Sequence, residues 1–262
     1  MSLLVLSFTD WNGISPNVAL VGIRNYVTAI HDPLFLQSLV NTLVYVGATL
    51  PMVLVAGLGA ALLVEHGGPL SGLLRVAFTI PFVVSIVVVA VVWSWIFDPH
   101  FGVLNFVLER FGVRGQDWLD EPRWAMLIII LPSVWRQFGY YMLILLAGLK
   151  NIDRSYREAA EMDGARYWSR LLRVTLPLLG PQLFFSLVIC AIDSFQVFAQ
   201  VDLMTQGGPV GSTTVAIYYM YQQGFQYFQM GIASAVAVML VVGVGALTYA
   251  QVRWVGRPVY YR

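Results

Sequence analysis

The stretch Glu158-Ala159-Ala160-Glu161-Met162-Asp163-Gly164, followed nine residues later by Val174-Thr175-Leu176-Pro177, decides the fold prediction because it is a polar island between long apolar runs. Residues 153–163 are predicted to form a short helix, since alanine and glutamate favour helices and Arg154/Glu158 and Arg157/Glu161 are i,i+4 pairs of opposite charge. Gly164 is expected to end this helix.

A second short helix is predicted after Gly164, with Trp168, Leu171 and Leu172 on one side, and it runs into Pro177. An apolar segment begins there. The two helices together predict a helix-turn-helix that lies at a membrane surface with its small residues outward.

This stretch resembles a known signature. The spacing E-A-A-x3-G-x9-I-x-L-P is similar to the signature loop of the membrane subunits of ABC importers, with Val174 in place of the usual isoleucine. The resemblance implies a coupling helix that docks into a cleft on a cytoplasmic ATP-hydrolysing subunit. Small side chains let another protein surface approach closely, and flanking charges fix the register. The residues expected to couple to the ATPase are Tyr156, Glu158, Ala159, Ala160, Met162, Asp163 and Gly164.

An alternative for this loop is an ordinary amphipathic connector. Ser155 and Glu158 have the spacing of a capping box, in which the glutamate would only satisfy backbone donors. Asp153 stands where the family often has a proline, and an aspartate can serve there as an N-cap.

Composition independently places the chain in a membrane. The sequence is 58% hydrophobic and only 11% charged, whereas a soluble domain usually carries about 25% charged residues. A water-soluble fold of 262 residues cannot hide that much apolar surface. The single cysteine, Cys190, excludes a disulfide within the chain.

The apolar runs predict an all-α, polytopic helical bundle with five spans, and the resemblance implies that it is of the type I ABC importer permease kind with a cytoplasmic coupling helix. The spans cover residues 36–64, 76–97, 124–149, 174–198 and 228–251. We expect an N-terminal stub and external connector (1–35), a transmembrane permease domain (36–252) containing the coupling loop (150–173), and a cytoplasmic tail (253–262). The apolar stub Met1–Phe8 is too short to cross a membrane, and it resembles the end of the family's first helix, which is expected to be missing or truncated.

Orientation follows from the basic residues. Ten of the 15 lie in the loop after the first span, in the coupling loop and in the C-terminal tail. The positive-inside rule therefore predicts that the coupling loop and the C-terminus lie in the cytoplasm of a multi-pass inner or plasma membrane protein.

The resemblance extends over nearly the whole chain and is closest to the carbohydrate branch of these permeases, of the maltose and sn-glycerol-phosphate type. The matching segments occur in order: Ser7-Phe8-Thr9-Asp10-Trp11, Gly22-Ile23-Arg24-Asn25-Tyr26, Asn41-Thr42, Pro99-His100-Phe101-Gly102-Val103-Leu104-Asn105, Leu146-Ala147-Gly148-Leu149 and Met204-Thr205-Gln206-Gly207-Gly208-Pro209.

No catalytic motif is present in the sequence. A phosphate-binding loop needs G-x-x-x-x-G-K-[ST], but the only lysine, Lys150, is followed by Asn151. A G-x-S-x-G elbow and metal-ligand spacing are absent, and the three histidines lie in different predicted loops. We therefore expect no enzyme activity, no metal and no cofactor on this chain, with ATP and Mg²⁺ bound by a partner subunit.

The substrate path is predicted from polar residues inside spans. A charge near the bilayer centre costs about 2.5–3.5 kcal/mol, so it usually faces a cavity or a partner. Arg136 and Asp193 are such charges, and they could contact a sugar or simply pair with each other as structural residues. Together with the resemblance, this predicts a path lined by Phe82, Ser85, Ile86, Ser133, Arg136, Gln137, Tyr140, Asp193, Ser194, Gln196 and Val197.

One loop remains open between two roles. Gly207, Gly208 and Pro209 are expected either to contact a binding protein or to form a structural turn near the outer entrance.

The predicted function is the permease subunit of an ABC importer that translocates a sugar or polyol. The expected partners are a second homologous permease, a dimer of cytoplasmic ATP-binding subunits, an extracytoplasmic solute-binding protein, the sugar and the lipid bilayer, with no nucleic acid. Two alternatives stay open: a permease for an anionic glycerol-phosphate-like solute, and a non-transporting membrane scaffold that docks an ATPase.

Overall fold

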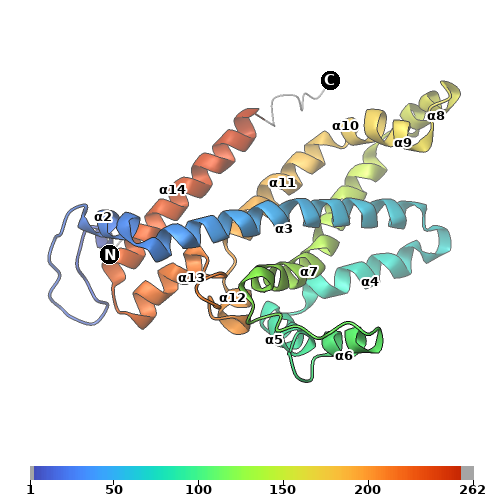
Figure 1. Cartoon of the computed structure of the whole chain (residues 1–262). Helices are drawn as coiled ribbons and strands as arrows, with labels where there is room; N and C mark the ends of the chain where they lie inside the picture. Colours follow the sequence, from blue (N-terminus) through green and yellow to red (C-terminus); the bar gives the residue numbers. More distant parts are fainter. Residues whose placement is uncertain (1–2, 255–262) are drawn as a thin grey trace. The chain divides into compact units, whose positions relative to one another are not determined.

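The computed structural model describes residues 3–254, except for the side chains of Arg157 and Trp254. Within that range the regular structure is helical and includes no strand, only an isolated bridge between Thr9 and Leu20 (Figure 1). The all-α prediction is confirmed. The longer helices are α2 (Arg24–His31), α3 (Pro33–His66), α4 (Ser71–Val83), α5 (Ile86–Ile96), α6 (Val103–Arg110), α7 (Pro122–Asn151), α8 (Arg154–Met162), α11 (Gly180–Phe195) and α14 (Met230–Trp254).

Shorter helical segments complete the described chain. They are α1 (Leu3–Leu6), a 3-10 turn at Gly68–Leu70, α9 (Tyr167–Arg170), π turns at Leu171–Thr175 and Gln222–Gln226, α10 (Leu176–Leu178), α12 (Ala199–Met204) and α13 (Ala216–Tyr221).

Three described helices, α3, α7 and α14, are each long and apolar enough to cross a membrane. α3 and α7 contain the predicted spans 36–64 and 124–149, and α14 covers the predicted span 228–251 from residue 230 onward. Two broken helix pairs, α4 with α5 and residues 167–178 with α11, bring the number of candidate spans to five if each pair crosses once.

The second predicted span, 76–97, is not the single helix that its apolar composition indicated. The helix stops at Val83, Val84 is extended with φ −68° and ψ 137°, and a new helix starts at Ile86. Residues 83–89 are mostly β-branched, which weakens helix preference locally. The Nε atom of Arg136 donates to the carbonyl oxygen of Val84 at 3.1 Å, so the backbone group released by the break has a partner.

The fourth predicted span, 174–198, also differs from the prediction. Residues 167–178 form one helical stretch that starts seven residues earlier than predicted, and α11 then follows at an angle of 71°. The bend falls at Leu179, between Pro177 and the Gly180-Pro181 pair. Proline removes a backbone donor and glycine weakens helix continuity, which explains a break at this position.

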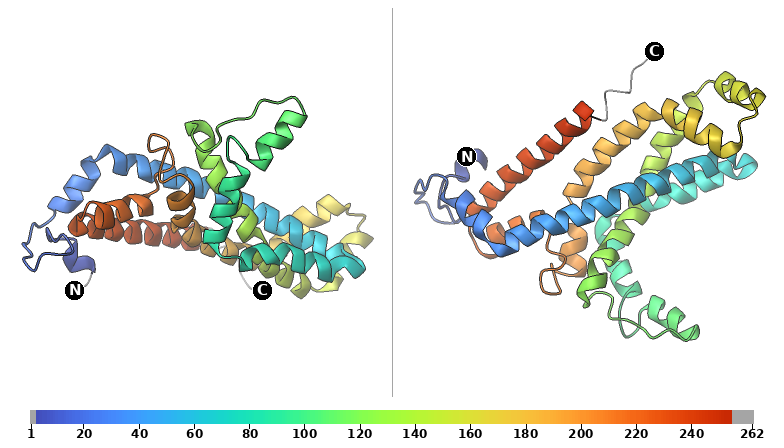
Figure 2. Two further views of the ribbon diagram at one scale, coloured as in Figure 1. Left: turned by 90° about the horizontal axis from the view of Figure 1, so that it is seen from below. Right: turned by 45° about the horizontal axis from the view of Figure 1, so that its top comes forward.

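The chain forms two compact units, each assembled from three segments. One unit combines residues 1–48, 86–133 and 193–247, and the other combines 49–85, 134–192 and 248–262, of which 248–254 are described. Figure 2 gives two further views of the helices that each unit contains. In the second unit Ala60, Ala61 and Val64 of α3 pack against Leu145 and Leu149 of α7.

The first unit holds two separate apolar clusters. Phe35 of α3, Tyr219 of α13 and Val236 of α14 form one of them. Ala90 and Phe97, which lie in and just after α5, pack with Ile128 of α7 and Met204 of α12 in the other.

Close backbone approach in the second unit depends on glycine. A Cβ atom added at Gly139 of α7 would overlap the carbonyl oxygen of Phe78 in α4, and one added at Gly57 of α3 would lie 3.2 Å from the amide nitrogen of Met142. Small residues at such crossings allow the van der Waals contact that holds helices together in lipid.

The helix at 154–162 has the termini that the sequence predicts. An oxygen of Asp153 accepts a hydrogen bond from the backbone nitrogen of Ser155 at 2.8 Å, so Asp153 is the N-cap. Gly164 follows the helix with φ +73°, the left-handed conformation that glycine adopts without strain. The alternative in which Ser155 and Glu158 form a capping box is wrong, because Ser155 lies inside the first turn, and Glu158 forms the predicted pair with Arg154 at 2.7 Å.

We predict that Gly139→Leu destabilises the second unit, because the added side chain overlaps the backbone of α4. Overpacking of this kind costs about 1–3 kcal/mol, and it should lower the thermal unfolding midpoint of the purified chain in detergent. Gly59→Ala in α3 is the control, since no atom lies within 4 Å of the added Cβ. Equal midpoints for both variants would contradict the close approach.

We predict that Asp153→Ala frays the start of α8, whereas Asp153→Asn, which keeps a capping oxygen, does not. The measurement is amide hydrogen exchange over residues 154–158. The hydrogen bond from the Ser155 backbone lowers the pKa of Asp153 below its ordinary 3.8. Its ionised form therefore stabilises the helix at pH values above the unfolded pKa, and that contribution disappears as pH falls through the lowered pKa. Equal exchange in Asp153→Ala and the wild type would show that the cap is dispensable.

Candidate coupling loop and substrate path

The residues predicted to couple to an ATPase lie on an exposed surface of α8. Met162 has 87% of its surface exposed and Tyr156 has 55%, while Glu158, Ala159, Asp163 and Gly164 are exposed as well. Ala160 is partly buried. The exposed apolar side chains in this surface continue beyond the turn to Trp168, at 69%. Exposed aromatic and methionine side chains next to small residues are typical of a protein contact surface.

Two contacts hold this surface to the rest of its unit. Glu161 of α8 forms an ion pair with Arg170 of α9, whose side chain is only 21% exposed. The ring of Tyr167 lies edge-on to that of His66 at the end of α3, with centroids 6.0 Å apart. Figure 2 shows α8 to α10, in yellow, at the same end of this unit as the connection from α3 to α4. The loop is therefore attached to the ends of long helices and is not an isolated appendage.

The ion pair between Arg157 and Glu161 that the sequence suggests lies outside the description, because the side chain of Arg157 is not described. Glu161 takes Arg170 as its partner. Sequence inspection missed Arg170, because its partner lies nine positions away across a turn.

The centre of the predicted path in the second unit is an aromatic and cationic cluster. The rings of Phe82 and Tyr140 are stacked, with centroids 4.8 Å apart and planes 19° from parallel. The guanidinium carbon of Arg136 lies 5.3 Å from the centre of the Phe82 ring, and its Nε donates to Val84. All three side chains are partly exposed. A cation held over an aromatic face beside a helix break is suited to bind hydroxyl or anionic groups.

Two further path residues carry buried polar atoms. The Oε1 atom of Gln137 in the second unit and the Oγ atom of Ser194 in the first unit each have no hydrogen-bond partner among the described residues. Buried polar atoms normally have partners, so each marks a place where a water or a solute group would be favourable.

The remaining predicted path residues differ in surroundings. Ser133 is fully buried and accepts a hydrogen bond from Gln200 at 3.0 Å while donating to Ile129, which gives it a structural role in the first unit. Gln200 was not among the predicted path residues. Of the others, Val197 is buried, Ile86 is partly exposed, and Ser85, Asp193 and Gln196 are exposed.

The segment Gly207-Gly208-Pro209 is built as a tight turn. The carbonyl oxygens of Gly207 and Gly208 accept hydrogen bonds from the hydroxyls of Thr214 at 3.0 Å and Thr213 at 2.6 Å. The amide of Asn41 donates to the carbonyl oxygens of Gly211 and Thr214, which ties the turn to α3. Neither threonine was identified from the sequence, although Asn41-Thr42 was among the segments that carry the family resemblance. These contacts support the structural-turn interpretation.

No group of three or more potential metal ligands occurs among residues 3–254.

The family match and the similar proteins agree on one family for this chain. Residues 53–259 match the family described as "Binding-protein-dependent transport system inner membrane component". The sulfoquinovosyl glycerol transport system permease protein SmoG of Agrobacterium fabrum is 35% identical over 84% of this chain and 71% of that protein. The sn-glycerol-3-phosphate transport system permease protein UgpA of Yersinia enterocolitica is 34% identical over 92% of this chain and 82% of that protein.

A solved structure has the same fold. A chain from a bacterial alginate ABC transporter, crystallised in complex with an alginate pentasaccharide-bound periplasmic protein, matches with a TM-score of 0.79 and 26% identity over 88% of this chain and 81% of that chain. The recognition made from the loop at 158–177 is confirmed, and the chain belongs to the binding-protein-dependent transport system inner membrane components, the permease subunits of ABC importers.

Proposed function

We propose that this permease imports a sugar or a sugar-like polyol, and that it uses the exposed surface of α8 to couple translocation to ATP hydrolysis on separate subunits. The observation that carries the proposal is the combination of small and apolar side chains exposed on α8 with the attachment of α8 to α9, which in turn contacts the end of α3. A surface built in this way transmits movement to the spans instead of absorbing it.

The proposed assembly contains this chain, a second homologous permease, two ATP-binding subunits and an extracytoplasmic solute-binding protein. The family description supports the binding protein, since it names a binding-protein-dependent system. The lack of a phosphate-binding loop supports separate ATPases, which would hold ATP and Mg²⁺. This chain itself would need no cofactor. In the same arrangement, Gly207, Gly208 and Pro209 lie near the outer entrance, where the neighbouring Val210 is 90% exposed and available to a binding protein.

The proposed orientation puts α8 and the C-terminus in the cytoplasm. Ten of 15 basic residues lie in the loops and tail assigned to that side, which supports it through the positive-inside rule. The connector at 12–35 then lies outside.

The proposed substrate class has support from the relatives and from the Arg136 cluster. SmoG and UgpA are named for the transport of a sugar-linked glycerol and of glycerol 3-phosphate. Arg136 offers donors for hydroxyl oxygens, and the Phe82–Tyr140 stack offers an apolar face for a sugar ring.

A solute that also carries an anionic group is a second candidate. The glycerol phosphate in the name of UgpA is an anion, and the stacked, partly exposed guanidinium of Arg136 would suit it.

We expect Ala160→Trp to abolish solute uptake in vesicles while leaving insertion and ATPase subunit expression unchanged, because the indole would block close contact at α8. Gly164→Asn tests the small residue at the turn without breaking the turn itself, since asparagine tolerates the left-handed conformation of Gly164 better than most other residues with a side chain. Ala160→Ser is the control and should transport normally. Normal uptake by the Ala160→Trp variant would overturn the coupling role. If the wild-type chain assembles with an ATPase but no solute is taken up, the scaffold alternative is favoured.

We expect Arg136→Gln to reduce uptake of an anionic solute such as sn-glycerol 3-phosphate more than uptake of a neutral sugar. Glutamine keeps donors for hydroxyls but removes the charge, and a lost charged hydrogen bond corresponds to about a tenfold or larger change in affinity. The measurement is the apparent KM for each solute in proteoliposomes containing the whole importer. An equal loss for both solutes, accompanied by a lower unfolding midpoint, would assign Arg136 only to the support of the Val84 break.

A further inference from the structure

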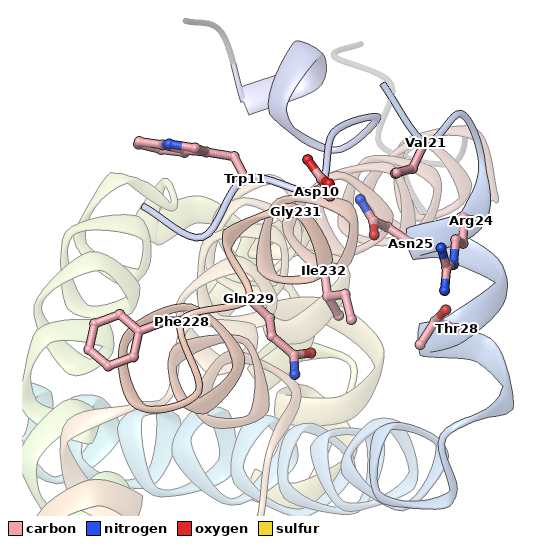
Figure 3. Close-up of a pocket in the computed structure, with 10 residues that line it drawn as sticks. All are labelled: Asp10, Trp11, Val21, Arg24, Asn25, Thr28, Phe228, Gln229, Gly231 and Ile232. Carbon is pink, nitrogen blue, oxygen red and sulfur yellow. The ribbon is translucent and has the colours of Figure 1, made fainter. Parts of the chain in front are cut away.

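A pocket of about 300 Å³ lies in the first unit (Figure 3). Its walls come from residues 10–21, from α2 and from the segment that leads into α14. The residues that line it include Asp10, Trp11, Arg24, Thr28, Phe228 and Gln229. In the proposed orientation this pocket opens to the outside.

The backbone that frames the pocket is held by buried contacts. The side-chain nitrogen of Asn25, which is only 7% exposed, donates to the carbonyl oxygens of Ser7 at 2.9 Å and Thr9 at 2.7 Å. The amide of Gly231 donates to the carbonyl of Trp11 at 3.1 Å, and a Cβ at Gly231 would overlap the carbonyl oxygen of Thr9. Residues 7–11 are thus tied directly to α2 and α14. The pocket is a built feature and not a gap under a loose loop.

The polar groups that face this pocket are available for a ligand. The side chains of Arg24, Thr28 and Gln229 are exposed, and none of them has a hydrogen-bond or ion-pair partner among residues 3–254. Asp10 uses one oxygen to accept from the backbone of Ala19 at 2.8 Å, and the carboxylate has a second oxygen. Together these side chains offer hydrogen-bond donors and acceptors to a ligand in the pocket.

Aromatic groups complete the lining. In Figure 3 Trp11 and Phe228 lie on one side of the pocket with their rings directed away from Arg24 and Thr28, which lie on the other side. Phe228 is half exposed and is held at φ +54°, an uncommon conformation for a residue other than glycine. Strained residues of this kind concentrate at ligand sites, where the surrounding structure maintains them.

We propose that this pocket is an external binding site for a mono- or disaccharide, separate from the path inside the spans. The hydroxyls of a sugar suit Asp10, Arg24 and Gln229, and Trp11 and Phe228 offer apolar surface to a sugar ring at the opposite edge of the pocket. The volume is at the lower end of that of small-molecule sites. The site would hold solute at the entrance after its release from the binding protein. The class of solute rests on the proposed function, whereas the existence of the site does not.

The test is hydrogen exchange of the full importer in nanodiscs, with glucose, maltose, glycerol and sn-glycerol 3-phosphate as probes at millimolar concentration and no binding protein present. We expect a sugar to slow exchange in peptides covering 10–28 and 225–232. In Arg24→Ala with Gln229→Ala the concentration needed should rise about tenfold or more, because a hydrogen bond to a charged group is lost. Arg114→Ala, which changes an exposed arginine outside the pocket, is the control and should match the wild type.

Two further readouts keep the outcome interpretable. Slow exchange at Asn25 without sugar must be unchanged in the double variant, which shows that the frame is intact. Uptake is measured separately in wild-type vesicles supplied with the binding protein. If a sugar is taken up but never slows exchange in the two peptides, the proposed binding site in the pocket is wrong while the proposed transport function stands. Slowing caused by the binding protein without sugar, and by no probe, would also overturn the proposal and assign the pocket to a protein contact.

Discussion

The constraint on which this structure depends is that backbone polar groups inside a membrane must find partners within the protein. A continuous helix without proline, such as α14, meets it along its length. The second span does not, because its helix stops at Val83 and resumes at Ile86. Arg136 supplies the missing donor to Val84. A charge such as Arg136 is unfavourable in lipid without a partner, and the carbonyl group of Val84 is unfavourable there without a donor. Each therefore compensates for the other.

This arrangement gives Arg136 two roles that share one geometry. Its Nε is used by the backbone, while the face of its guanidinium lies against Phe82, which is stacked on Tyr140. A helix break, a cation and two aromatic rings thus occur together within the candidate membrane spans of one unit. Irregular backbone at membrane depth is tolerated where it is buried in protein or lines a cavity, which is consistent with a place on a substrate path.

The loop for which a coupling role is proposed is not subject to this constraint. Its polar and small residues lie outside the apolar helices, and α8 exposes Met162 and Tyr156. What it needs is a fixed position. Asp153 caps its start, Gly164 turns the chain at its end, and Glu161 connects it to Arg170 of the next helix. These local contacts make α8 a defined surface at the end of its unit.

The sequence by itself determined the class of this protein. Apolar runs of about 20 residues indicate spans, and the loop at 158–177 is a local pattern of small and charged residues, so both can be recognised without knowing any contact between distant segments. The Asp153 cap and the Gly164 turn were predictable for the same reason. Only the tertiary structure decided where the second and fourth spans break, that Arg136 bonds to Val84, that Gln200 bonds to Ser133, and that Asn25 and Gly231 frame a pocket. Those contacts join residues far apart in the chain, 52 positions for Arg136 and Val84 and 67 for Gln200 and Ser133, and a pattern along the sequence does not specify which distant groups will meet.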